Sequence, residues 1–326
     1  MAVEQERDNG MSLRGKKLGV LLPHGERGMG GETPRGADVL ALANMTEDAG
    51  FDSVWLVDHF LWHVPALDRF EERVAEGEKG IRLGYWECLT LASALAVTTS
   101  RVEIGTLVVN TGYRNPALLA RMVDTVDELS AGRLILGLGA GGVPGEYDAF
   151  GYDYERRVGR FEEALQIIRP LLRGESVTFT GDFYRTKEAE LRPKGVRAEG
   201  PPILIGLLKG GPRMQRLVAQ YADQWNCWLC FGDSRVGAYR EARAGIVVAC
   251  EKHGRDPASL TKNVAVVVSF GAESSPGASP ITGTDEEIAD EIAAYLDEDV
   301  DHIVFKPDPR NAEGIEALAR VLERLG

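Results

Sequence analysis

The chain has 326 residues, of which 44% are hydrophobic and 27% are charged. This composition excludes disordered, collagen-like and disulfide-scaffold proteins, and it supplies enough apolar residues for one large core. The 50 Asp and Glu residues outnumber the 37 Lys and Arg residues, which gives a net charge of −13. Because such a surface repels phosphate backbones, we expect no nucleic-acid partner.

No apolar run is long enough to cross a membrane, and the N-terminal residues lack the apolar segment of a signal peptide. We therefore expect no membrane association and a cytoplasmic location. The four cysteines are Cys88, Cys227, Cys230 and Cys250. They are too few and too scattered for a disulfide framework, so we interpret them as reduced thiols. The polar, aperiodic residues 1–15 predict a flexible tail before a single domain at 16–326.

Eight short apolar or β-branched runs alternate with eight longer stretches of helical periodicity. The predicted strands are 18–23, 52–58, 102–109, 133–139, 202–206, 224–229, 264–270 and 302–306. Their near-continuous apolar character is typical of parallel strands covered by helices. The pattern predicts a closed (β/α)8 TIM barrel with insertions, and an open doubly wound sheet is the alternative. Catalytic groups of such barrels follow the C-terminal ends of the strands.

Three helix starts carry a local signal. Thr33 before Pro34 and Asn115 before Pro116 each place a capping side chain ahead of a proline at the first helical position. Thr284 with Glu287 has the spacing of a capping box. In the helix after Pro116, we expect one buried face made of Leu118, Met122, Val126 and Leu129.

The second predicted strand ends in Asp58 and His59, followed by Trp62 and His63. A histidine at the catalytic end of a barrel strand can exchange a proton near neutral pH, and Asp58 could orient it or complete a hydrogen-bond network. His63 is a weaker candidate of the same kind, and a structural role is the alternative for both histidines. We expect no metal site, because no third ligand stands at tetrahedral spacing.

Strands three and four end in polar and glycine-rich segments. Asn110, Thr111, Tyr113 and Arg114 offer hydrogen-bond groups and a ring to the barrel mouth, or else form a plain turn. Residues 137–142 formally match a dinucleotide fingerprint, but no helix begins at once after them. We interpret Gly139 and Gly141 instead as positions where a flat ring can lie on the backbone.

The segment after strand five predicts a phosphate site. Lys209, Gly210, Gly211 and Arg213 surround the start of a helix at Pro212, where free backbone N–H groups attract anions. A Gly-Pro turn with solvated charges is the alternative. Cys227 and Cys230 have the spacing of a redox motif, but they lie at a strand end and are expected to pack there.

Taken in order, these segments resemble one family. The stretches FDSVWLVDHF, RVEIGTLVVNTGYRNPALLARMVDTVDELSAGRLILGLGAGG, RVGRFEEALQIIRPLLRG and GGPR leading to YADQWN are similar to the luciferase-like monooxygenase superfamily, in its branch that uses the deazaflavin coenzyme F420. The resemblance implies a (β/α)8 barrel with an insertion near strand seven, commonly a homodimer. It also implies a coenzyme at the strand ends, with His59 facing the reactive ring, Gly210 and Gly211 at its phosphate, and a non-proline cis peptide at Leu107-Val108.

Two positions depart from the family pattern. The glutamate that sugar-phosphate dehydrogenases of this branch carry after the strand-four glycines is Gly142 here, so their acid/base scheme is not transferred. Glu146, four residues later, is kept as a substrate-facing candidate. Bacterial luciferases carry an arginine two residues beyond the proline of the strand-three turn, where this chain has Leu118, which favours the deazaflavin over FMN.

The first hypothesis is an oxidoreductase that passes hydride between F420 and a small organic substrate. His59 would move the proton with Asp58 and Asn110 in support, while Trp62, His63, Trp86, Tyr113 and Glu146 would face the substrate. The residues that would hold the coenzyme are Leu107, Val108, Asn110, Gly139, Gly141, Lys209, Gly210, Gly211 and Arg213, and a separate reductase is a candidate partner. The alternatives are a two-component monooxygenase that uses reduced FMN, and a barrel that binds a flavin without catalysis.

Overall fold

The computed structural model describes residues 13–26, 32–63, 80–208, 210–271 and 279–325. Most of the tail expected at 1–15 lies outside these residues. Leu13 is described, and it is 8% exposed and packs in the core. None of the described helices is long and apolar enough to span a bilayer.

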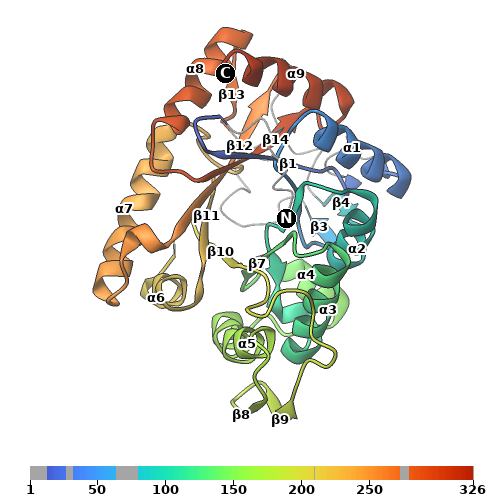
Figure 1. Cartoon of the computed structure of the whole chain (residues 1–326), viewed down its shortest axis with the longest axis vertical. Helices are drawn as coiled ribbons and strands as arrows, with labels where there is room; N and C mark the ends of the chain where they lie inside the picture. The colour runs from blue at the N-terminus through green and yellow to red at the C-terminus, as the bar shows by residue number, and fades with distance from the viewer. Residues whose placement is uncertain (1–12, 27–31, 64–79, 209, 272–278, 326) are drawn as a thin grey trace, which may run out of the picture.

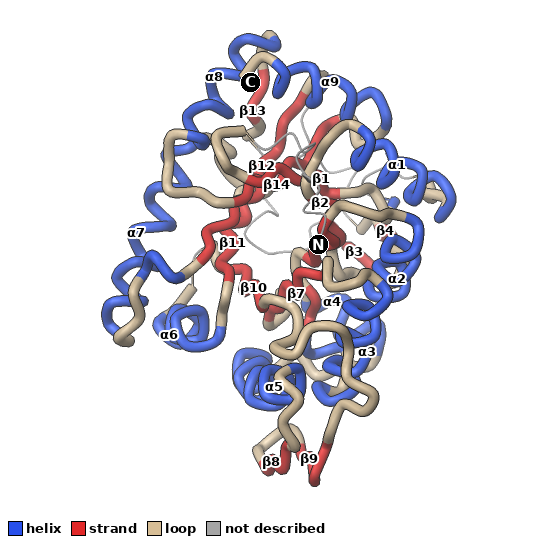
Figure 2. Tube along the Cα trace, in the orientation of Figure 1, coloured by secondary structure: helices blue, strands red, loops and turns tan. Residues whose placement is uncertain are grey.

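Eight parallel strands close into a barrel, which confirms the predicted fold (Figures 1 and 2). In chain order they are β1 Lys17–Leu21, β2 Ser53–Leu56, β5 Glu103–Thr106, β7 Leu134–Gly139, β10 Ile203–Gly206, β11 Gln224–Trp228, β12 Thr261–Ser269 and β14 His302–Asp308. The pairs β7–β10 and β14–β1 complete the ring. All eight predicted strands are present, with bounds that differ by a few residues.

A helix follows each strand on the outside of the ring (Figure 2). These helices are α1 Gly36–Asp48, α2 Cys88–Thr98, α3 Pro116–Leu129, α5 Arg157–Leu172, α6 Pro212–Tyr221, α7 Val236–Lys252, α8 Asp285–Leu296 and α9 Ala312–Glu323. The additional elements are the hairpins β3 Leu61–His63 with β4 Arg82–Gly84 and β8 Val177–Thr180 with β9 Arg185–Ala189, the helix α4 Pro144–Phe150, and the short strands β6 Val109–Asn110 and β13 Ile281–Thr282. Most of the additional elements therefore follow the strand ends where the site was predicted.

Two of the three predicted helix starts are confirmed. Asn115 accepts hydrogen bonds from the first-turn amides of α3, and Thr284 and Glu287 form the reciprocal capping box of α8. The prediction for Thr33 is wrong, because α1 begins at Gly36 and the Thr33 hydroxyl donates to Glu26 instead.

The buried face of α3 also differs from the prediction. Leu118 and Leu129 are 55% and 46% exposed, and the buried residues are Pro116, Leu119, Ala120, Val123, Asp124, Val126 and Asp127. Two aspartates can lie on this face because each has a cationic partner that neutralises it. Asp124 pairs with Lys194 and Asp127 with Arg197, both from the segment before β10.

Two apolar layers hold the barrel together. A large outer cluster fills the space between the strands and the helices, and a smaller one, which includes Leu21, Trp55, Ile135 and Val267, fills the barrel interior. All four cysteines are buried free thiols, and Cys230 packs in the inner cluster. The interior is thus filled below the strand ends, and the functional cavity lies above it.

Candidate active site

One cavity of about 640 Å³ opens at the C-terminal ends of the strands, a size that suits a cofactor. The cavity lining includes Asp58, His59, Trp62, Tyr85, Leu107, Val108, Asn110, Gly139, Gly141, Glu146, Arg157, Met214, Trp228, Phe231, Lys306 and Arg310. They come from the ends of most of the strands, so the barrel brings together residues that are far apart in the chain.

His59 is held by a carboxylate from another part of the chain. Its Nδ1 lies 2.8 Å from Glu146 Oε2, a residue of α4 that is only 1% exposed. The His59 side chain is 25% exposed and lines the cavity. Because an ionised carboxylate only accepts hydrogen bonds, Nδ1 carries the proton and Nε2 is the nitrogen left for chemistry in the cavity.

Glu146 is charged despite its burial. Its Oε1 accepts from the Phe60 and Leu61 amides at 2.8 and 3.0 Å, and its Oε2 also accepts from the Tyr113 hydroxyl at 3.0 Å. Burial alone would raise the pKa of this carboxyl, but His59 and the two amides lower it below its ordinary value. The same burial, together with Glu146, raises the pKa of the Tyr113 phenol, so Tyr113 remains a donor.

Asp58 does not orient His59 as expected. Arg114 binds both of its oxygens at 2.6 and 2.9 Å, and the backbone amide of Asn110 donates to Oδ2 at 2.9 Å. Arg114 also pairs with Glu87. The expectation failed because adjacency in sequence does not bring Asp58 to the His59 ring, whereas Glu146 reaches the ring from 87 residues away.

The Leu107-Val108 peptide is cis, at the position that the resemblance implied. The Val108 side chain occupies the space that side chains would take at two neighbouring strand ends: a Cβ at Gly139 would lie 2.6 Å from it, and one at Gly206 would lie 3.1 Å from it. Leu107 and Val108 both line the cavity. Gly139 therefore makes room for Val108, and both residues line the cavity.

Gly141 also leaves room for neighbouring side chains, in this case those of Asn110 and Tyr147. It adopts φ +74°, and a Cβ there would lie 2.4 Å from the Asn110 amide nitrogen and 2.2 Å from the Tyr147 hydroxyl. The Asn110 side chain accepts from Tyr147 at 2.8 Å and from the Gly112 amide at 2.9 Å. The glycine thus leaves space for the hydrogen bonds that fix Asn110 two residues after the bulge at the Leu107-Val108 cis peptide.

Aromatic rings line the cavity next to His59. Trp62 and Tyr85 pack on the His59 ring at centroid distances of 4.9 and 5.5 Å, and Phe231 stacks on Trp62 at 5.6 Å. Trp62 was a predicted substrate-facing residue, whereas Tyr85 and Phe231 were not predicted. Their signal was weak, because an aromatic residue in a loop is more often packing than binding.

Three predicted substrate residues lie elsewhere. Trp86 is 48% exposed and its indole donates to the Pro34 carbonyl. The neighbouring residue Tyr85, and not Trp86, belongs to the described cavity lining. Tyr113 lies behind Glu146 and stacks on Phe60, outside the described cavity lining. His63 lies in β3 against Gly145 and is likewise absent from that lining.

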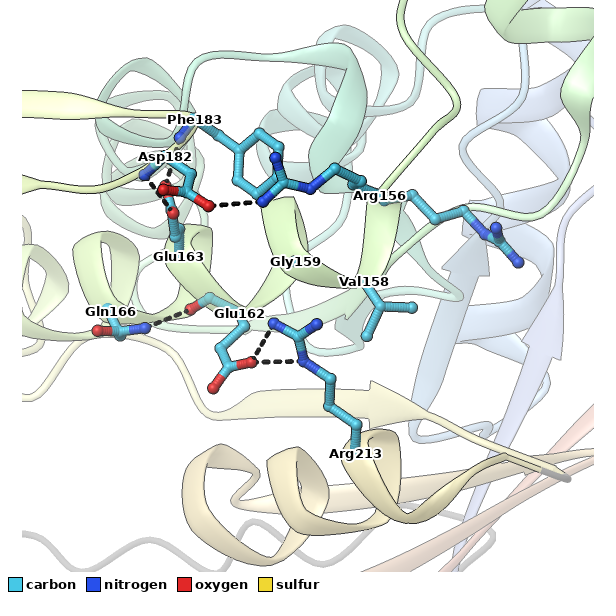
Figure 3. Close-up of a pocket in the computed structure, with 10 residues that line it drawn as sticks. Arg156, Val158, Gly159, Glu162, Glu163, Gln166, Asp182, Phe183 and Arg213 are labelled. Carbon is cyan, nitrogen blue, oxygen red and sulfur yellow. Dashed lines mark hydrogen bonds and ion pairs between the residues drawn. The ribbon is translucent and has the colours of Figure 1, made fainter.

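The structure places only part of the predicted phosphate segment at the cavity. Lys209 lies outside the described residues. Gly211 precedes α6 and has no side chain to cap it, so the first-turn amides of the helix are open, and Met214 of this turn lines the cavity. Arg213 points away toward α5, where its Nε donates to Glu162 Oε2 at 2.7 Å beside a second cavity of about 380 Å³ (Figure 3).

Two cations at the end of β14 were not predicted. Lys306 is 4% exposed, and both Lys306 and Arg310 line the cavity. The signal was present in the sequence, since both stand at or just beyond the C-terminal end of the eighth strand, but positive charges near a strand end are usually solvated.

The chain is similar to proteins of known function. It is 32% identical to the F420-dependent glucose-6-phosphate dehydrogenase of Amycolatopsis mediterranei over 197 residues, which cover 58% of this chain and 53% of that protein. The chain thus spans about half the length of this curated relative. A solved F420-dependent secondary alcohol dehydrogenase, in complex with an F420-acetone adduct, superposes with a TM-score of 0.75 at 18% identity, covering 95% of this chain and 99% of that one.

A second solved structure has the same fold. The monooxygenase RslO1 from Streptomyces bottropensis superposes with a TM-score of 0.72 at 21% identity, covering 94% of this chain and 96% of that one. At these identities the superpositions show the fold alone. The family model described as luciferase-like monooxygenase matches residues 16–296, and the chain therefore belongs to the luciferase-like monooxygenase family.

Proposed function

We propose that the protein is an oxidoreductase that passes hydride between coenzyme F420 and a small organic substrate. The observation that carries this proposal is the His59–Glu146 pair, which leaves one imidazole nitrogen available beside an apolar bulge. The relatives described above support the choice of coenzyme, since their names include F420.

The cavity fits a flat ring system. Val108 presents an apolar surface on one side of the cavity, because Gly139 and Gly206 have no side chains and leave room for it. His59 and its aromatic neighbours provide the other lining groups, and the start of α6 offers open amides for the coenzyme phosphate. When bound, the deazaflavin supplies a carbon that accepts or donates a hydride.

The residues of the chain would supply orientation and the proton. Oxidation of an alcohol needs a base for the hydroxyl proton, and reduction of a carbonyl needs an acid for the oxygen. His59 Nε2 can take either part, because Glu146 fixes the ring by Nδ1 and stabilises the imidazolium. The apolar aromatic neighbours limit the water around the reacting groups.

The alternative is a monooxygenase that uses reduced FMN, because the matching family model is described as luciferase-like monooxygenase. Leu118 does not separate the two: it is 55% exposed on α3 and absent from the described cavity lining. Coenzyme identity therefore has to be measured.

The test is a parallel titration of the purified protein with oxidised F420 and with FMN, followed by tryptophan fluorescence. Trp62 and Trp228 line the cavity, so a bound ring should quench them. We expect F420 to bind at least about tenfold more tightly than FMN. Tighter binding of FMN, or binding of neither, would overturn the proposal.

A pair of variants tests the role of His59. His59→Ala should keep F420 binding and lose most turnover of any substrate found by screening, by about 10²-fold or more. The control is His253→Ala, which changes an exposed histidine at the end of α7. Equal turnover in the two variants would remove His59 from the mechanism.

We further propose that the protein is a homodimer that receives reduced or oxidised coenzyme from a separate enzyme. The support for a dimer is the exposed apolar surface of the adjacent helices α2 and α3, where Val97, Leu118 and Leu129 are 66%, 55% and 46% exposed. Light scattering of the purified protein measures the mass directly, and a monomer across micromolar concentrations would reject this assembly.

A further inference from the structure

The cavity has an excess of positive charge although the whole chain has a net charge of −13. Its described lining includes two carboxylates, and both have partners: Glu146 binds His59, and Asp58 binds Arg114. The same lining contains the cations Arg157, Lys306 and Arg310. The excess therefore belongs to the cavity itself and is not a property of the surface.

Arg310 is the most unusual of these cations. Among the described residues, no group forms a hydrogen bond or an ion pair with its guanidinium. Burial lowers the pKa of Arg310, and the charge of Asp308 opposes that effect without reaching ion-pair distance. Arg310 is partly exposed and lines the cavity, so its guanidinium is open to an anionic ligand there.

The neighbours of Arg310 place it close to the reacting groups. It lines the same cavity as His59 and Tyr85. The Tyr85 ring lies 5.7 Å from the His24 ring and 5.5 Å from the His59 ring. His24 is not an anion that could satisfy Arg310, because burial lowers its pKa to about 4 and leaves it neutral.

Arg157, the cation from α5, is already engaged. Its Nε donates to the Gly141 carbonyl at 3.3 Å, and its guanidinium lies 4.4 Å from the centre of the Tyr154 ring. Lys306 stands on β14, four residues before Arg310, and it lines the same cavity. Both cations thus line the cavity, and a planar guanidinium is suited to bind a carboxylate or phosphate through two hydrogen bonds.

We propose that Arg310, assisted by Lys306, binds a carboxylate or phosphate group of the substrate, so that the substrate is a small organic anion. This inference rests on the proposed function. With a hydroxy acid, the carbon that bears the hydroxyl loses its hydrogen with the bonding electron pair to the oxidised deazaflavin. The hydroxyl proton passes to His59 Nε2, and the carbon–oxygen double bond forms; the reverse reaction reduces an oxo acid.

The first test compares acids with their neutral amides. Glycolate, lactate, 3-hydroxybutyrate and mandelate are each titrated beside the matching amide, at constant ionic strength, into protein with and without F420. Binding is followed as the rise in melting temperature. We expect at least one acid to bind about tenfold more tightly than its amide, and this preference to fall below about twofold in Arg310→Met.

The matched control is Arg320→Met, which removes a charge from the exposed end of α9 and should keep the preference. If no acid binds better than its amide, or if Arg310→Met keeps the preference, the proposal is overturned. Because Arg310 has no described partner to lose, Arg310→Met should fold with a melting temperature at or above that of the wild type.

F420 itself carries phosphate and carboxylate groups, so the coenzyme is the competing source of the anion. We expect Arg310→Met to change F420 affinity by less than about twofold, whereas a loss of about tenfold would assign Arg310 to the coenzyme and overturn the proposal. The coenzyme-free arm separates the two proposals: acid preference without F420 binding would reject the function and keep the anion site.

Discussion

The substitution Glu146→Gln tests the central pair of the site with a change of one atom. Glu146 accepts four hydrogen bonds, from the Phe60 and Leu61 amides on one oxygen and from His59 and Tyr113 on the other. A glutamine has one carbonyl oxygen and one NH₂ group. Its oxygen can accept hydrogen bonds from only one of the two sets of donors. Its NH₂ group, itself a donor, then faces the other set.

The two orientations differ in cost. If the NH₂ group faces the two backbone amides, two buried donors lose their acceptor, at about 1–3 kcal/mol each. The favoured orientation therefore keeps the oxygen on the amides and turns the NH₂ group toward His59. Nδ1 must then accept, so the proton moves to Nε2, the nitrogen that faces the cavity.

The loss of function follows from this tautomer. A neutral imidazole protonated at Nε2 cannot take a proton from a substrate hydroxyl, and the ionised partner of the imidazolium is gone. Hydrogen bonds to charged groups contribute about 1.5–3 kcal/mol, and a positioned general base contributes about 10²–10⁴-fold. We expect turnover to fall by about 10²-fold or more, while F420 affinity stays within about threefold.

The assay combines turnover with ¹⁵N NMR of labelled histidine, which identifies the protonated ring nitrogen of His59. The matched control is Glu163→Gln, because Glu163 also accepts backbone amides, those of residues 182–184, but lies outside the described cavity lining. Glu163→Gln should leave the tautomer unchanged. Turnover of Glu146→Gln within about threefold of the wild type would refute the reasoning, whatever the tautomer.

Three further outcomes concern stability. Gly139→Ala should cost about 1–3 kcal/mol by overpacking against Val108 and should weaken F420 binding, whereas Gly142→Ala meets no atom within 4 Å and should be neutral in chemical denaturation. Burial lowers the pKa of His302 from 6.5 to about 3, so the unfolded chain binds the proton first as the pH falls. The unfolding free energy should therefore decrease below pH 6.5, by at most about 1.4 kcal/mol per pH unit for this group, and His302→Gln should reduce that slope in urea titrations. Asp127→Asn should cost about 3 kcal/mol, because it leaves a partly buried arginine without its carboxylate; an unchanged urea midpoint would reject that pairing.

The barrel was predictable because its signals are local. Each strand is a short apolar run, and the caps at Asn115 and Thr284 depend on residues two or three positions away. The buried face of α3 was not predictable in the same way. Asp124 and Asp127 are polar in sequence, and the cations that neutralise them stand 70 residues later in the chain. Hydrophobic periodicity cannot register a charge that is buried by a distant partner.

The site shows the same division between local and distant information. His59 was predictable from its place at a strand end, and the cis peptide at Leu107-Val108 followed from family resemblance. The partner of His59 was not, because Asp58 was the candidate in sequence and Glu146 was expected to face the substrate. Glu146 reaches the ring from α4, a short helix in an insertion that sequence periodicity did not resolve.

Asp58 has a different part in the same site, and its contacts indicate which. Its oxygens receive Arg114 and the Asn110 amide, and the Asn110 side chain in turn accepts from Tyr147. Asn110 follows the Leu107-Val108 bulge by two residues, so a buried ion pair anchors the backbone directly after the bulge. Because the Asp58 carboxylate is bound by Arg114 and the Asn110 amide, it positions the surface that a ring would touch. In the proposed reaction, proton transfer would then fall to His59. In the proposed reaction, adjacent residues of one strand end would therefore have separate roles: Asp58 would position the surface under the coenzyme, and His59 would exchange the proton with the substrate.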